Sequence, residues 1–189
     1  MANVETIIGV EERKPSGTIM AASLAPSLLL SMPQLLDENF CRTVVQLCKH
    51  NHEGAFGLVV NRPLLTTRRE LELWVGGPVE PERSWILVGG DEYTDLPGMR
   101  VADGLSLSTS PNLLQRLLEG NPPANARLIA GYAGWGPGQL EAELNASAWL
   151  IGEVDRELIF STPADRMWET AIRRLGADPA ALQMSRGIH

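Results

Sequence analysis

The stretch RLIAGYAGWGPGQLEAEL, residues 127–144, organises the rest of the chain. It begins with an apolar run, Leu128–Ala130, that predicts a buried strand. Glycines then recur at positions 131, 134, 136 and 138, after which Leu140 and Leu144 fall on one face of a predicted helix. A strand, a glycine turn and a helix in this order can hold a binding site at the end of the strand. They can equally be a tight connection that binds nothing.

The segments before this stretch predict a β-hairpin. Two apolar runs, TVVQLCKH at 43–50 and GAFGLVVN at 54–61, flank a short polar loop, as paired strands do. Pro63 ends the second strand, because proline cannot donate to a ladder. The segment 91–103 is polar and is predicted to be a loop, and the alternation at 105–108 indicates a strand with one wet face. Other apolar runs predict strands at 27–31, 85–88, 148–151 and 158–160.

Helix signals are clearest at 110–120 and 162–176. Ser110 and Thr162 are candidate N-caps, each is followed by a proline, and each apolar stripe ends at a glycine. Shorter helices are predicted at 67–73 and from Asp178 onward. Because strands and helices interleave while a hairpin is also present, the predicted fold class is α/β with α+β character, a mixed sheet with helices on its faces.

The charge and composition of the chain narrow the classes of function. It has 189 residues, a length that suits one domain. Residues 1–17 are predicted to form a flexible N-terminal arm, and residues 18–189 are predicted to form a single domain. The chain has a net charge of −7, so it lacks overall the excess of basic residues that a nucleic-acid-binding protein needs. The same negative charge disfavours binding to an anionic membrane surface. Prolines at 26 and 33 interrupt the longest apolar segment, 19–36, so no membrane-spanning helix or signal peptide is expected. We therefore expect a cytoplasmic protein with reduced cysteines.

The glycine turn is one candidate ligand site. Backbone N–H groups at the start of a helix can cradle an anion, and Trp135 can stack on a ligand. Arg62, after the polar Asn61 at the end of the hairpin, can clamp a carboxylate or phosphate with its planar fork. The glycine spacing fits neither the dinucleotide fingerprint nor a phosphate-binding loop. The alternative is that the glycines permit a tight turn and that Arg62 pairs with a carboxylate, such as Asp37 or Glu141.

A second candidate site lies on the first strand of the hairpin. Cys48, His50 and His52 alternate, so in a regular strand all three side chains point to one face and can bind a transition metal. No matched second cluster supplies a fourth ligand, so no metal is predicted. The alternative is a core cysteine with histidines at a hairpin tip. No serine nucleophile elbow is present, and the spacing gives no catalytic triad.

Four motifs occur together in this chain: GAFGLVVNRP at 54–63, GGPV at 76–79, GYAGWGPGQLEAEL at 131–144 and LIFSTP at 158–163. In combination they resemble the YqgE/AlgH family of bacteria, over about residues 17–179. The resemblance implies a cytosolic protein of α/β character with a mixed sheet and a smaller inserted α+β portion. It also implies a regulator of transcription that controls polysaccharide production, for which no catalytic activity is established. The segment between the Asn-Arg-Pro and Gly-Gly-Pro motifs, residues 64–75, is shorter than is usual in the family. The motif residues that the resemblance carries over are Arg42, Cys48, His50, Asn61, Arg62, Gly77, Gly134, Trp135 and Gln139.

The leading hypothesis is therefore a non-enzymatic regulatory or interaction protein that needs no cofactor. Its expected partner is another protein or a small anionic ligand, with no direct contact to nucleic acid and none to a membrane. The first alternative is a small-anion or nucleotide-binding module lined by Asn61, Arg62, Gly134, Trp135, Gly136 and Gln139, with Arg42, Cys48 and His50 as secondary candidates. The second alternative is a hydrolase-type enzyme.

Overall fold

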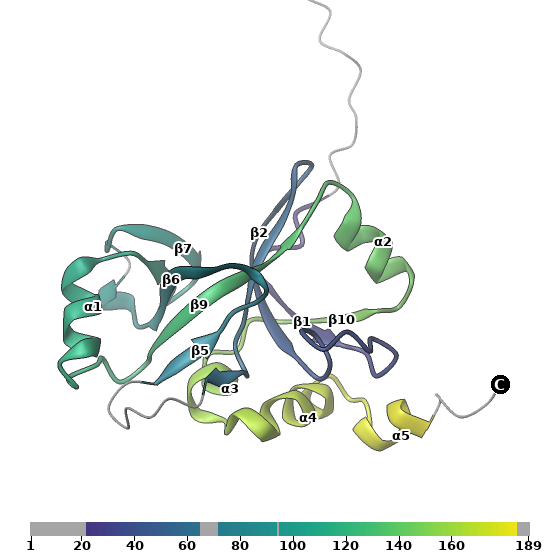
Figure 1. The fold of residues 1–189 in the computed structure, drawn as a ribbon. Helices are drawn as coiled ribbons and strands as arrows, with labels where there is room; N and C mark the ends of the chain where they lie inside the picture. Colours follow the sequence, from purple (N-terminus) through teal and green to yellow (C-terminus); the bar gives the residue numbers. More distant parts are fainter. Residues whose placement is uncertain (1–21, 65–71, 94, 185–189) are drawn as a thin grey trace, which may run out of the picture.

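The computed structural model describes residues 22–64, 72–93 and 95–184 (Figure 1). The predicted N-terminal arm, the short helix predicted at 67–73 and most of the shortened segment 64–75 lie outside these residues; Leu73 itself begins a strand. The strands are β1 (Ser27–Ser31), β2 (Val44–Asn51), β3 (Gly54–Val59), β4 (Pro63–Leu64), β5 (Leu73–Val75), β6 (Val79–Gly89), β7 (Gly98–Ala102), β8 (Leu105–Ser108), β9 (Ala126–Trp135) and β10 (Trp149–Gly152). The helices are α1 (Pro111–Leu118), α2 (Gln139–Asn145), α3 (Arg156–Ser161), α4 (Ala164–Arg174) and α5 (Pro179–Met184), with a short 3-10 helix at Asp91–Tyr93.

The strands of these residues form one mixed sheet in the order β10-β1-β2-β3-β9-β6-β8-β7. Neighbours along this path are antiparallel, whereas β5 runs parallel to β9. The long strand β9 joins the two halves: its end pairs with β3, with Ala55 opposite Trp135, and its beginning pairs with β5 and β6. The predicted α+β fold with a mixed sheet is thereby confirmed.

Helices cover both faces of the sheet, as predicted. In Figure 1, α3 and α4 lie below the sheet and α2 lies on the other side of β1 and β10. The main core contains Met167, Trp168 and Ile172 of α4. Leu140 of α2 packs in a second core with Trp135 and Trp149. A third core holds α1 against β6 and β9. No helix in the described ranges is both long and apolar enough to cross a membrane.

The central stretch begins with a buried cation. Arg127 is 7% exposed, and its guanidinium lies 3.8 Å from the ring centroid of Trp74 and donates a hydrogen bond to the carbonyl of Val60. Burial lowers the pKa of Arg127 to about 10, with Glu72 opposing the shift, so the side chain stays charged at neutral pH. The aromatic face and the carbonyl together replace the lost hydration of this charge.

Several predictions of secondary structure were wrong, mainly after the central stretch. The apolar run at 158–160 forms α3, because Asp155 caps it and accepts a hydrogen bond from the N–H of Leu158 at 2.9 Å. Thr162, which was predicted to be the N-cap of the last long helix, is instead the C-cap of α3. The N-cap of α4 is Pro163. The loop predicted at 91–103 contains β7 and a 3-10 helix.

Two predicted strands differ in extent or exposure. β9 continues through Gly131 and Gly134 to Trp135, so that the turn is limited to residues 136–138. β8 has no wet face, since all four of its residues are buried. The hydroxyl of Ser108 donates to the carbonyl of Pro97 and accepts from the N–H of Ser110, so the loop into α1 covers the side that was predicted to be wet. The hairpin β2–β3 and the Ser110 cap of α1 are as predicted.

Candidate functional site

The glycine-rich stretch folds around one carboxylate. Glu143 of α2 accepts hydrogen bonds from the indole N–H of Trp135 at 2.9 Å and of Trp149 at 2.7 Å, both at Oε2. Its Oε1 accepts from the side-chain amide of Gln139, also at 2.9 Å. These four residues, the Glu143 cluster, tie the end of β9 and the start of β10 to the helix between them.

The tryptophans of this cluster are inside the protein. Trp135 is 6% exposed and Trp149 is 3% exposed. Their ring centroids lie 6.0 Å apart, and Phe40 packs against both at 6.4 and 5.7 Å. Trp135 therefore contributes aromatic packing to the core and presents little face for a ligand.

The turn that links β9 to α2 is satisfied internally. The N–H of Gly136 donates to the side-chain oxygen of Gln139 at 3.0 Å. Gly138 occupies the N-cap of α2 with φ +73°, a left-handed conformation that glycine adopts most readily. Gly134 is exposed within β9, where the ring of Tyr132 lies beside it. This arrangement works as a structural joint between strand and helix.

Asn61 and Arg62 lie at the other end of the hairpin, away from the Glu143 cluster. The side-chain oxygen of Asn61 accepts from the N–H of Val44, and its amide donates to the carbonyl of Arg42, both at 2.9 Å. Arg62 donates to the carbonyl of Cys41 at 2.6 Å and borders a cavity of about 210 Å³. Neither Trp135 nor Gln139 lines that cavity, so the predicted site residues form two groups.

Arg42 belongs to a contact between a loop and α4. It pairs with Glu169 at 2.8 Å, and its guanidinium lies 5.0 Å from the ring centroid of Trp168. Half of the Arg42 side chain is exposed, so this ion pair contributes little to stability. Trp168 is fixed independently, since its indole N–H donates to the carbonyl of Ser31 at 2.9 Å.

Cys48 and His50 do not share a face, contrary to the prediction from alternation. A β-bulge interrupts the pairing of β2 with β3 between Leu47 and Lys49 and reverses the alternation there. Cys48 consequently points into the main core, whereas His50 lies opposite Ala55 on the α2 side. Within the described ranges, no three His, Cys, Asp or Glu side chains are grouped so that they could hold a metal ion.

Burial makes the Cys48 thiol unreactive. Desolvation raises its pKa to about 12, so only roughly one molecule in ten thousand carries the nucleophilic thiolate at pH 8.

Cys41, in contrast to Cys48, is partly exposed. We expect a thiol reagent such as 5,5′-dithiobis(2-nitrobenzoate) to label one cysteine of the native protein quickly and the second only after unfolding. Cys41→Ser should abolish the fast phase and Cys48→Ser should leave it. A fast phase that instead depends on Cys48 would contradict this account.

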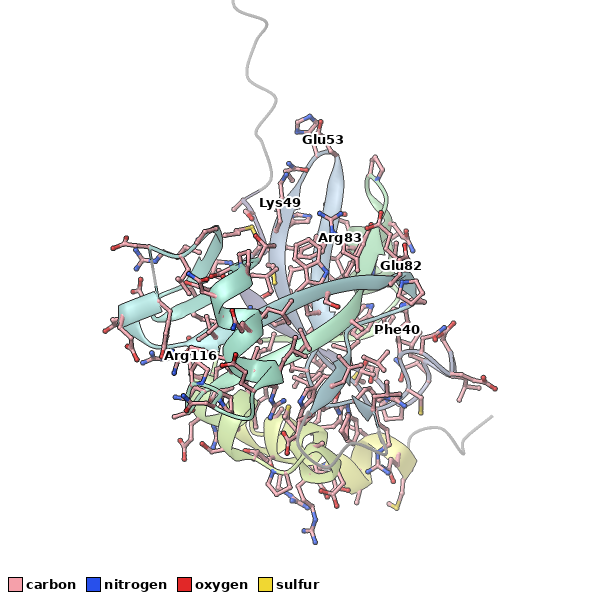
Figure 2. The ribbon with its side chains drawn as sticks, turned by 60° about the vertical axis from the view of Figure 1, so that its left-hand side comes forward. Phe40, Lys49, Glu53, Glu82, Arg83 and Arg116 are labelled. Atoms are coloured by element: carbon pink, nitrogen blue, oxygen red, sulfur yellow. The ribbon has the colours of Figure 1, made fainter. Side chains whose placement is uncertain are left out.

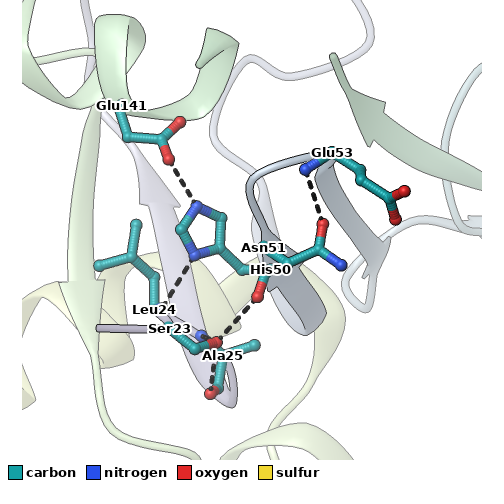
Figure 3. A network of polar contacts seen from close by, with 7 residues as sticks. All are labelled: Ser23, Leu24, Ala25, His50, Asn51, Glu53 and Glu141. Carbon is teal, nitrogen blue, oxygen red and sulfur yellow. Dashed lines mark hydrogen bonds and ion pairs between the residues drawn. The ribbon is translucent and has the colours of Figure 1, made fainter. Parts of the chain in front are cut away.

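His50 ties three segments together (Figure 3). Its Nδ1 accepts a hydrogen bond from the N–H of Leu24 at 3.1 Å, which places the ring proton on Nε2, 2.8 Å from the Glu141 carboxylate. The hydroxyl of Ser23 also donates to the His50 carbonyl. Both ring nitrogens are thus occupied within the protein, and in this arrangement neither can take a proton from a substrate.

The Glu141 carboxylate supports this tie at neutral pH. A backbone hydrogen bond, and after it the hydrogen bond from His50, lowers the pKa of Glu141 from 4.5. A carboxylate with a lowered pKa stabilises the fold fully above its ordinary value, and the contribution is lost as the pH falls through the lowered one. Because 42% of the Glu141 side chain is exposed, solvent screening keeps this contribution small.

A cleft beside the sheet edge is the feature that the sequence analysis missed. It has a volume of about 440 Å³ and lies between the strands β1 and β10 and the helices α3 and α4. Its apolar lining comes from buried leucines and an alanine: Leu28, Leu30, Leu158 and Ala171. Its rim carries Glu153, Asp155 and Arg174. A glycine at 152 in an apolar strand was the available signal, since glycine in a strand often marks a close approach or a gap.

Charges of both signs alternate at the hairpin end of the molecule. Figure 2 labels Lys49 and Glu53 on the hairpin β2–β3, and Glu82 and Arg83 on β6. Arg83 pairs with Glu80 at 3.1 Å and lies 4.5 Å from the ring centroid of Trp85. This surface is mixed and has no basic stripe of the kind that follows a phosphate backbone.

The fold and these sites define a class of α+β protein in which one mixed sheet carries helices on both faces and a glycine-rich joint connects β9, α2 and β10. The chain belongs to the AlgH-like family, whose model matches residues 28–180. It is 40% identical to a UPF0301 protein of Myxococcus xanthus, over 88% of this chain and 99% of that one.

Two solved structures share the fold. The solution structure of the AlgH protein from Pseudomonas aeruginosa is 31% identical, with a TM-score of 0.67, and the match covers 92% of this chain and all of that one. An X-ray structure of a protein from Corynebacterium diphtheriae matches with a TM-score of 0.66 over 87% of this chain and 92% of its own. At 21% identity, this second likeness concerns the fold alone.

Proposed function

We propose that the protein is a non-enzymatic interaction protein and that its binding face is the β10 edge of the sheet together with the cleft beside it. The observation that carries this is Ile151, which is 43% exposed in the middle of a strand that pairs only with β1 among the described residues. An open strand edge bearing an aliphatic side chain is an unsatisfied surface that natural proteins normally cover or use. We further propose a regulatory role in the cytoplasm, at the level of transcription, as the family resemblance implies.

The two alternatives have weaker support from the geometry. An anion at the glycine turn would compete with Gln139 for the N–H of Gly136. A histidine that acts as a general base needs a free ring nitrogen, and both nitrogens of His50 are engaged. Cys48 is held as a thiol by burial. The candidate residues in these places hold the fold together.

A photo-crosslinking amino acid tests the proposed face in living bacteria. At Ile151 we expect a discrete covalent adduct with another protein, and at Leu118 of α1, which is 58% exposed and distant in the fold, only background. The adduct is then identified by mass spectrometry and the partner purified. Its binding in vitro should be lost with Ile151→Arg and kept with Leu118→Arg. If positions 151 and 118 give the same adducts, or if neither gives one, this face does not bind a partner.

A further inference from the structure

We propose that the occupant of this face is an extended peptide that adds to β10 as a further strand, inserting an aliphatic side chain into the cleft and placing a basic side chain at its rim. This inference rests on the proposed function and specifies the chemistry of the partner. In strand addition, main-chain hydrogen bonds provide affinity and pockets for alternate side chains provide specificity.

The register of β10 fixes where side chains of an added strand would point. Gly152 lies opposite Leu28, on the cleft side, whereas Ile151 lies opposite Leu29, on the α2 side. Successive residues of a strand point to opposite faces. One residue of the added strand therefore enters the cleft while its neighbour packs over Ile151.

The cleft is open because residue 152 has no side chain. The nearest atoms to a Cβ there would be Cδ2 and Cδ1 of Leu175 at 3.5 and 3.9 Å and the Cβ of Leu28 at 3.9 Å, which are ordinary contacts. The floor of leucines and alanine accepts a valine, leucine or isoleucine, whose burial there is favourable. A substitution at Gly152 can consequently fill the cleft without straining the strand.

The rim is acidic. Arg174 pairs with Asp155 and, at 3.8 Å, with Glu157, so its charge is already compensated. Glu153 lines the cleft and has no ion-pair partner in the part of the chain that the structure describes. The two carboxylates of the rim, Glu153 and Asp155, thus stand against one guanidinium, which Glu157 also contacts from outside the cleft, and a lysine or arginine of the peptide complements this excess.

The same charges disfavour a second copy of the chain as the occupant. Two β10 strands paired about a two-fold axis would place residues 149–152 of one copy opposite those of the other, and residues 148–153 contain no basic side chain. A second copy therefore leaves the excess negative charge of the rim uncompensated, whereas a basic peptide supplies the missing positive charge. A heterologous peptide is therefore the better match.

The test measures fluorescence anisotropy with synthetic peptides about six residues long, the usual length of a strand. They alternate valine and threonine, with the first valine replaced by lysine, so that the lysine lies on the same face of the strand as the valine that enters the cleft. Matched peptides carry glutamate in place of that lysine, or proline in place of the central valine, which removes a main-chain donor. We expect the lysine peptide to bind at least about tenfold more tightly than either, a factor set by roughly 1.4 kcal/mol.

Two variants locate the binding. Gly152→Val should weaken the lysine peptide about tenfold or more, since it fills the cleft with atoms that a peptide side chain would displace. Glu153→Lys should reverse the preference between the lysine and glutamate peptides. Leu118→Ser should change neither. Circular dichroism checks that every variant is folded.

The outcomes separate this inference from the proposed function. No binding of the lysine peptide, equal binding of the proline peptide, or binding indifferent to Gly152→Val overturns strand addition, and so does a wild-type dimer in sedimentation that Ile151→Arg dissociates. If a crosslinked partner is nevertheless found at Ile151, the interaction face stands and only the peptide chemistry is wrong. If the peptides bind as expected but no partner crosslinks in cells, the site is real and the proposed cellular function fails.

Discussion

Replacing Gly77 by alanine is expected to lower the free energy of unfolding by roughly 3–5 kcal/mol, the sum of backbone strain and overpacking. Gly77 has φ +150°, and a Cβ would lie 2.2 Å from the carbonyl oxygen of Tyr132. The chain cannot retreat from this contact. The adjacent Gly76 accepts a hydrogen bond from the N–H of Val59 and donates one to the carbonyl of Ala130, which clamps it between β3 and β9.

Gly138→Ala is the matched control. Gly138 also has a positive φ, +73°, but no heavy atom of the described chain other than those of Gly138 and its near neighbours in sequence lies within 4 Å of a Cβ added there. Its substitution should cost only about 1–2 kcal/mol, the usual penalty for a left-handed residue with a side chain. Urea unfolding followed by tryptophan fluorescence measures both. Equal losses in the two variants would mean that the close approach of Gly77 to β9 is not a constraint on the fold.

The parts of the fold that the sequence predicts are those specified by neighbouring residues. Ser110, Pro111 and the leucines at 113 and 117 specify α1 within a few positions, and the cap is found where expected. The run at 158–160 was too short for its period to distinguish strand from helix, and Asp155, three residues earlier, decides the matter by capping. A short apolar run can therefore be assigned to a strand or a helix only when the capping residues beside it are also considered.

The parts that could not be predicted depend on residues far apart in sequence or on a change of register. A single bulge after Leu47 separates the faces of Cys48 and His50, and no local composition announces a bulge. From the sequence alone, Trp135 is a plausible platform on which a ligand could stack. In the structure, Glu143 and Phe40, from elsewhere in the chain, enclose its ring. The cleft at Gly152 depends in the same way on helices that follow β10 in sequence and return to pack against β1.

Replacing Glu143 by leucine is expected to cost roughly 2–4 kcal/mol and to loosen β10. Leucine fills similar space but leaves the indole N–H groups of Trp135 and Trp149 buried without an acceptor, and each unpaired buried donor costs about 1–3 kcal/mol. Glu143→Gln keeps an acceptor and should lose about 1 kcal/mol. Urea unfolding measures the loss, and near-ultraviolet circular dichroism reports the altered packing of the tryptophans.

A double-mutant cycle shows whether the loss comes from the indole groups. With Trp149→Phe already in place, one donor is absent, so Glu143→Leu should cost at least about 1 kcal/mol less than it does in the wild type. An unchanged cost would place the effect of Glu143 outside the cluster. Because Trp149 begins β10, Glu143→Leu should also weaken peptide binding at Ile151 and Gly152, although it touches neither residue. Such a result would mean that the Glu143 cluster fixes the position of β10, the strand to which the peptide binds.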